Sequence, residues 1–224
     1  MIIQKLFPLF DRAHGSNVAG KASPAHIVPA KFNDDDQLVF REFEFSEDMI
    51  DRIEQKWTAM GYESERTIPD NCPLEPGLLI RQQRINAFKP KGQIITLSIH
   101  SNAITMGDKW QNTATGFAYF TAKGITNSDK MNTRLYKFSE QYFPEIYHYK
   151  SNSPEYPGKE ANFTVLTAKG NAILLEIGFQ DNRKDVAMLL DPKFREKYST
   201  MIVEWLVAEN RLLIQVQNSQ NSAK

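Results

Sequence analysis

Two short motifs, far apart in the chain, each place a histidine at the end of an apolar segment. His14 stands in Asp-Arg-Ala-His-Gly directly after the apolar residues 6–10, and His100 stands in Ser-Ile-His-Ser-Asn-Ala. A third apolar segment, residues 172–179, carries a carboxylate at Glu176. Imidazole and carboxylate groups are the usual ligands and proton carriers of hydrolytic metal centres. These motifs therefore predict a metal-dependent hydrolase.

The composition is ordinary for a globular protein and excludes several classes. The 224 residues are 41% hydrophobic and 24% charged, and the 27 basic residues balance the 27 acidic ones. Because the balanced charge gives no net positive field to attract nucleic acid, we set nucleic acid aside as a partner. The single cysteine, Cys72, rules out an internal disulfide and any zinc site with several cysteines.

The N-terminal segment is not typical of a secretory signal. Gln4, Lys5 and Pro8 interrupt its apolar residues, and no small-residue cleavage site follows. No segment approaches the roughly 20 apolar residues that span a bilayer. We therefore expect a protein that is cytoplasmic at synthesis and has no membrane span. The alternative is a secreted or periplasmic form from which a signal has been removed.

Segments typical of strands alternate with segments typical of helices. Strands are predicted at residues 6–10, 63–67, 94–100, 116–120, 163–166 and 172–178. Helices are predicted at residues 78–88, 128–142, 181–190 and 193–211. A further helix should follow an N-cap at Ser46 and stop at Gly61. Residues 15–40 and 144–161 should form long loops.

This alternation predicts a single α/β domain with a mixed, mostly parallel central sheet and helices on both faces. We assign residues 1–212 to this domain and residues 213–224 to a polar, frayed C-terminal tail. In such sheets, ligand sites lie beyond the carboxyl ends of the strands. Both His14 and His100 fall at such ends.

The same motifs resemble those of the zinc-dependent N-acetylmuramoyl-L-alanine amidases of the amidase_3 type. The segments around His14 and His100 resemble the family's Asp-Pro-Gly-His-Gly-Gly and Ser-Ile-His-Ala-Asn-Ala. The segment Leu-Glu-Ile-Gly-Phe-Gln-Asp-Asn around Glu176 resembles its Val-Glu-x-Gly-Phe-x-x-Asn. Arg81 begins a segment similar to the family's Arg-x-x-x-Ala-Asn. The resemblance covers nearly the whole chain, in the family's order.

The resemblance implies a function and a set of roles. His14, Glu42 and His100 would bind one Zn²⁺ ion, and Glu176 would be the catalytic acid and base. The implied reaction is hydrolysis of the amide between N-acetylmuramic acid and L-alanine of peptidoglycan stem peptides. Peptidoglycan is then the partner, and we expect a monomer. With one catalytic domain, a phage or prophage endolysin fits best, and a bacterial autolysin is the variant.

Several alternatives stay open at this level. Glu42 is found by counting back from Gly61, and Glu44 is near enough to serve instead. Arg81 is expected to be a structural partner inside the fold, with contact to substrate as the alternative. Trp110, in the loop after the His100 motif, could stack on a sugar or a stem peptide.

The remaining histidines and the departures from the family matter less. His26 and His148 are expected to be solvated or locally hydrogen-bonded. Arg12 and Ala13 replace the family's Pro and Gly, which predicts a less tight turn or a contact from Arg12 to substrate. Two other functions use the same residues: a zinc peptidase or other amide hydrolase with a different substrate, and a catalytically inactive wall-binding module.

Overall fold

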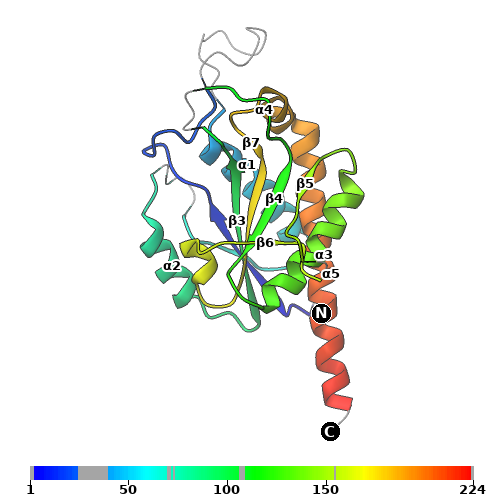
Figure 1. Ribbon diagram of the computed structural model, residues 1–224. Helices are drawn as coiled ribbons and strands as arrows, with labels where there is room; N and C mark the ends of the chain where they lie inside the picture. The colour runs from blue at the N-terminus through cyan, green and yellow to red at the C-terminus, as the bar shows by residue number, and fades with distance from the viewer. Residues whose placement is uncertain are drawn as a thin grey trace.

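A mixed sheet forms the centre of the structure, a computed structural model that describes residues 3–24, 40–69, 72, 74–105, 109–153 and 155–222 (Figure 1). The strands are β1 (Leu6–Arg12), β2 (Glu65–Arg66), β3 (Gln93–Asn102), β4 (Phe117–Thr121), β5 (His148–Tyr149), β6 (Lys159–Glu160) and β7 (Asn171–Phe179). The helices are α1 (Glu42–Ala59), α2 (Leu78–Ala87), α3 (Asn127–Tyr142), the 3-10 helix η1 (Thr164–Thr167), α4 (Arg183–Leu190) and α5 (Pro192–Ser222).

The strand order is β2-β1-β3-β7-β4-β5, with β6 beside β4. Strands β2, β1, β3 and β7 are parallel, and β4 runs antiparallel to β7. The parallel strands β1, β3 and β7 consist almost entirely of buried residues, as expected for strands covered on both faces. The predicted α/β domain with a mixed, mostly parallel sheet and helices on both faces is confirmed.

The two faces of the sheet are covered unequally. On one face, α1, α3, α4 and α5 pack over inward-facing residues of β1, β3, β4 and β7 and form the main core, which includes the fully buried Trp57 and Trp205. On the other face, α2 and η1 cover a small cluster: Leu9, Ile85, Ile94, Val165, Leu166, Ala172 and Leu174. Because side chains alternate along a strand, Asp11, Ser98 and His100 belong to this thinly covered face.

The start of α1 differs from the prediction. The helix begins at Glu42, so Ser46 lies inside it and is not an N-cap. The Ser46 hydroxyl instead donates to the backbone oxygen of Ile99 at 2.7 Å and accepts from the backbone N–H of Ala13 at 3.0 Å. The serine hydroxyl therefore does not cap the helix, and it joins α1 to the ends of β1 and β3.

The strand predicted at residues 163–166 is wrong, because this segment forms the 3-10 helix η1. Val165 and Leu166 are adjacent in sequence and are both buried in the cluster under α2. Neighbouring residues of a strand point to opposite faces, so a strand could not bury both there. The side chain of Gln82 in α2 holds the turn by donating to the backbone oxygen of Thr164 at 3.2 Å.

Two predicted irregular regions contain regular structure. The loop predicted at residues 144–161 includes the two-residue strands β5 and β6, which extend the sheet beside β4. Helix α5 continues to Ser222 through most of the expected tail, since no Gly or Pro interrupts residues 213–222, and its end projects away from the rest of the molecule (Figure 1). Within the described ranges, every helix is too short or too polar to cross a lipid bilayer.

Candidate metal centre

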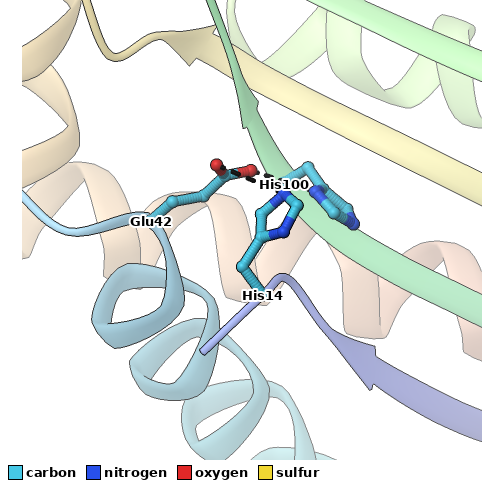
Figure 2. A group of neighbouring side chains, drawn as sticks. All are labelled: His14, Glu42 and His100. Atoms are coloured by element: carbon cyan, nitrogen blue, oxygen red, sulfur yellow. Dashed lines mark hydrogen bonds and ion pairs between the residues drawn. The ribbon is translucent and has the colours of Figure 1, made fainter. Parts of the chain in front are cut away.

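Two imidazoles and a carboxylate, each from a different part of the fold, lie close together at one edge of the sheet. His14 follows the end of β1, His100 lies near the end of β3, and Glu42 is the first residue of α1. Strands β1 and β3 are adjacent and parallel, so their carboxyl ends meet at the same edge of the sheet. Figure 2 shows the three side chains pointing toward one another.

The distances within this group suit a shared cation. One potential ligand atom from each of His14, Glu42 and His100 lies within 4.8 Å of the other two. Nδ1 of His100 is 3.0 Å from Oε1 of Glu42, and Nε2 of His14 is 3.7 Å from Oε2 of the same carboxylate. The two imidazole rings meet edge to face, with centroids 5.1 Å apart. We call these three residues the His/Glu cluster.

The structure distinguishes Glu42 from Glu44 by position. The side chain of Glu42 is 1% exposed, and its Oε1 also accepts from the backbone N–H of Ser101 at 3.1 Å. Its place in the first turn of α1 puts the carboxylate at the positive end of the helix dipole. Glu44 is 54% exposed and pairs with Arg41 on the helix surface at 3.1 Å. Glu42 is therefore the carboxylate that lies beside the histidines.

Burial and charge act against each other in the His/Glu cluster. Burial lowers the pKa of His14 to about 4, although the charge of Glu42 opposes this. Burial also disfavours the charged form of His100, but the hydrogen bond and charge of Glu42 outweigh it and raise the pKa of that imidazole. Burial of Glu42 is likewise outweighed by the hydrogen bond and charge of His100, so the pKa of Glu42 is lowered. The carboxylate stays ionised and attracts positive charge.

The backbone at His14 is strained. Its φ of 43° lies in the left-handed region, which residues other than glycine rarely adopt. The next residue, Gly15, has no room for a side chain, since a Cβ there would lie 2.3 Å from the backbone nitrogen of Glu75. The neighbouring Arg12 is buried and pairs with Glu47 at 2.8 Å, so it holds the turn against α1 and does not line the pocket described next.

A pocket of about 610 Å³ opens beside the His/Glu cluster on the thinly covered face. Glu176 of β7 reaches it because it pairs in register with His100 on the adjacent strand. Burial raises the pKa of Glu176 to about 7, and its Oε2 has no hydrogen-bond partner among the described residues. A carboxyl group with such a pKa can accept and return a proton near neutral pH.

The donor set fits a metal ion. Oε2 of the buried Glu42, like Oε2 of Glu176, lacks a hydrogen-bond partner within the described part of the chain. Buried polar atoms almost always have one, and the exceptions mark functional sites or missing ions. Two imidazoles and a carboxylate are a ligand set that catalytic zinc sites use, with a fourth position left for substrate or water.

The other residues singled out in the sequence have different positions: Arg81 lines the pocket, whereas Trp110 and His148 do not. Arg81 is 2% exposed and pairs with Asp11 at 2.7 Å inside the fold, as expected for a structural partner. Trp110 lies under the guanidinium of Arg183, 4.4 Å from its ring centroid, and does not line the pocket. His148 is locally hydrogen-bonded to Ser139 at 2.7 Å, as expected. His26 and most of the loop predicted at residues 15–40 lie outside the described residues.

Some residues of the site carried no signal in the sequence. Lys21, Asn162 and Gln180 line the pocket, and Glu75 lies beside His14 with 3.4 Å between its Oε2 and Nδ1 of the imidazole. Lys21, Asn162 and Glu75 stand in no recognisable motif, because each comes from a loop whose course depends on the folded chain, and Gln180 occupies a variable position of the motif around Glu176. The position of Gly15 directly after His14 was an available hint that another segment passes close by.

Comparisons with known proteins agree with this geometry. The family model described as N-acetylmuramoyl-L-alanine amidase matches residues 10–207. A search of curated proteins finds no match.

Solved structures share the fold at low sequence identity. The N-acetylmuramoyl-L-alanine amidase from Clostridium difficile 630 is 19% identical, with a TM-score of 0.68 over 92% of this chain and 97% of that chain. The amidase Ami1 from Mycobacterium smegmatis is 19% identical, with a TM-score of 0.65 over 92% and 97%. The catalytic domain of the endolysin CD27L, which targets Clostridia difficile, is 14% identical, with a TM-score of 0.61 over 92% and 98%.

Proposed function

The chain belongs to the N-acetylmuramoyl-L-alanine amidase family, and from this premise we propose that His14, Glu42 and His100 bind a single zinc ion and that Glu176 is the catalytic acid and base. The activity is that of a peptidoglycan N-acetylmuramoyl-L-alanine amidase, a metal-dependent amide hydrolase. The bond cleaved joins the lactyl group of N-acetylmuramic acid to L-alanine of the stem peptide.

One observation carries the metal assignment. The three ligand atoms converge within 4.8 Å around a buried carboxylate that has an unpartnered oxygen. Without a cation, an ionised Glu42 would keep one oxygen unsatisfied in a site where burial makes that costly. Imidazole nitrogen and carboxylate oxygen together favour zinc over the hard cations Mg²⁺ and Ca²⁺, which prefer oxygen ligands.

The position of Glu176 supports a proton-transfer role. A bound zinc ion supplies Lewis-acid polarisation of the amide carbonyl. Glu176 takes a proton from the water that attacks the carbonyl carbon, and then delivers that proton to the leaving nitrogen of L-alanine. The products are a free lactyl carboxylate and a peptide with a free amino terminus. Glu176 lies on the strand beside His100 and lines the same pocket, so it faces the place where the scissile bond must lie.

One experiment tests both which bond is cleaved and which residues are needed for cleavage. Purified peptidoglycan is digested with the wild-type protein, Glu176→Gln and His100→Ala, and the products are analysed by mass spectrometry. Wild-type protein purified with stoichiometric zinc should release peptides that begin with L-alanine. Glu176→Gln should retain zinc and lose activity, whereas His100→Ala should lose both. Internal cleavage of the stem peptide, or full activity of Glu176→Gln, would contradict the proposal.

We further propose that the protein is a phage or prophage endolysin, made in the cytoplasm and released to the wall by another protein, and that it acts as a monomer. The shared fold with the CD27L endolysin domain supports the first point. Residues 6–12 form the buried central strand β1, so these apolar residues belong to the folded domain.

Expression in a bacterial host tests the release step. Induced alone, the protein should accumulate without lysis, and lysis should follow when a membrane-permeabilising protein is co-expressed. Lysis by the protein alone would overturn the proposed route. Light scattering after size exclusion should give the monomer mass of 25.7 kDa.

A further inference from the structure

A branched network of buried polar residues lies behind the His/Glu cluster. Its centre is Arg81 of α2, whose guanidinium contacts two carboxylates. Nη2 donates to Oδ2 of Asp11 at 2.7 Å, and Nη1 donates to Oε1 of Glu75 at 3.3 Å. Arg81 and Asp11 are 2% and 0% exposed, and Glu75 is 12% exposed. Each carboxylate leads to one of the two histidines.

The first branch runs from Asp11 to His100 through Ser98. The hydroxyl of Ser98 donates to Oδ2 of Asp11 at 2.6 Å, and Nε2 of His100 lies 3.1 Å from the same hydroxyl oxygen. A hydroxyl has one hydrogen, so Ser98 can only accept from His100. Nε2 of His100 must therefore carry the hydrogen. Its other nitrogen, Nδ1, lies 3.0 Å from Oε1 of Glu42, and a metal ion bound there would replace the hydrogen on Nδ1 and take its lone pair.

The second branch runs from Glu75 to His14 directly. Oε2 of Glu75 lies 3.4 Å from Nδ1 of His14. A carboxylate can only accept, so it favours the tautomer of His14 with the hydrogen on Nδ1. The lone pair of Nε2 then faces Glu42, whose Oε2 is 3.7 Å away. The missing side chain of Gly15 allows the backbone of Glu75 to approach this closely.

We propose that Arg81, Asp11, Ser98 and Glu75 are positioning residues that fix the two histidines in opposite tautomers, so that Nδ1 of His100 and Nε2 of His14 face one metal ion. This inference rests on the proposed ligand set. One guanidinium orients both carboxylates, and each carboxylate orients one imidazole. Outer partners of this kind are worth about 10- to 100-fold in metal affinity at other metal sites.

The network makes predictions specific to each branch. Ser98→Ala removes the acceptor of His100 and should weaken zinc binding by about 10- to 100-fold. Glu75→Ala should weaken it to a similar extent through His14, and Glu75→Gln should fall between Glu75→Ala and the wild type because its amide oxygen can still accept. Glu75 is 12% exposed and Ser98 is 0% exposed, so the Glu75 variants should disturb the fold less than Ser98→Ala does.

The matched control is Glu209→Gln. Glu209 is 4% exposed and binds Arg134 through both carboxylate oxygens, at 2.5 and 2.6 Å. It is as buried as the network residues but lies between α3 and α5, on the far side of the sheet. Its substitution should lower Tm and leave zinc affinity within twofold of the wild type.

Two measurements test the proposal, neither of them catalytic. Competition with a chelator gives the zinc Kd of each variant, and ¹⁵N NMR of labelled histidines in the zinc-loaded protein identifies the metal-bound nitrogen of each ring. Wild type should bind through Nδ1 of His100 and Nε2 of His14. Ser98→Ala should disturb the signals of His100 and spare those of His14, and Glu75→Ala should do the reverse.

The outcomes separate the two proposals. If the wild type binds no zinc, the ligand set fails and the network proposal fails with it. If the wild type binds zinc but both variants keep its Kd within twofold and its nitrogen assignments, the ligand set stands and the network proposal is overturned. A loss of Tm without any change in Kd, as expected for Glu209→Gln, would give the network a purely structural role and would also overturn it.

Discussion

A group of tyrosines packed under the helices and the site at the ends of β1 and β3 treat buried polar groups in opposite ways. On the thickly covered face, Tyr119, Tyr136, Ser139, His148 and Tyr198 form a tyrosine cluster in which each hydroxyl has a partner. Tyr198 donates to Tyr119 at 2.9 Å, Tyr119 and Ser139 are 2.8 Å apart, and Tyr136 donates to a backbone oxygen at 2.6 Å. At the ends of β1 and β3, Glu42 and Glu176 each keep an unpartnered oxygen, and the backbone of His14 is strained.

This difference in hydrogen bonding indicates that the tyrosine cluster serves stability and that the metal site serves function. A fully partnered cluster under several helices contributes to folding and has no capacity left to bind a ligand. Unpartnered oxygens and a strained residue are unfavourable for folding, and they persist where a ligand or reaction makes use of them. We therefore expect substitutions in the two regions to affect different measurements.

The largest effect on the hydrolysis rate should follow Glu176→Gln. General acid and base catalysis is worth about 10²- to 10⁴-fold, so the rate of peptidoglycan hydrolysis should fall by that factor, or about 3–5 kcal/mol of activation free energy. Tm should stay equal or rise, because a neutral amide replaces a buried carboxyl group without a partner. Hydrolysis rates and thermal unfolding of the zinc-loaded protein check this. A rate within tenfold of the wild type would remove Glu176 from the mechanism.

The next largest effect should follow removal of the metal, and it should appear in the free energy of unfolding. At zinc concentrations about 1,000 times Kd, binding stabilises the folded state by about 4 kcal/mol, and a chelator should abolish this contribution and lower Tm. The shift should be the same in Tyr198→Phe as in the wild type, because distant sites contribute additively. Differential scanning fluorimetry with and without chelator measures both. Unequal shifts would show that the two regions are coupled.

A smaller effect is expected for Tyr198→Phe itself. The substitution removes one buried hydrogen bond to Tyr119, which is worth about 1 kcal/mol in the free energy of unfolding. Denaturant unfolding should show this loss, and the hydrolysis rate and zinc Kd should remain within twofold of the wild type. If the hydrolysis rate fell by more than the loss of folded protein explains, the tyrosine cluster would also contribute to catalysis, contrary to this prediction.

The sequence predicted the central features because they depend on local patterns. Continuous apolar segments identified β1, β3 and β7, and the motifs at their ends identified His14 and His100. Parallel pairing then requires these ends to meet, so much of the site follows from the strand assignments.

The errors arose where tertiary contacts override local preference. Ser46 looks like an N-cap, but its hydroxyl bonds to the ends of two strands. Val165 has strand propensity, yet η1 buries it together with Leu166 under α2. Glu75 could not be found at all, since only the folded chain brings its loop beside His14.

The smallest effect should follow Glu44→Gln, which lies two residues after Glu42 in the first turn of α1. Glu44 is more than half exposed and pairs with the exposed Arg41, an arrangement worth a few tenths of a kcal/mol. Its substitution should therefore leave Tm, zinc Kd and hydrolysis rate nearly unchanged. The matched variant Glu42→Gln removes the same charge two residues earlier and should abolish stoichiometric zinc binding. Equal zinc affinities in the two variants would mean that burial beside the histidines does not determine which carboxylate binds the metal.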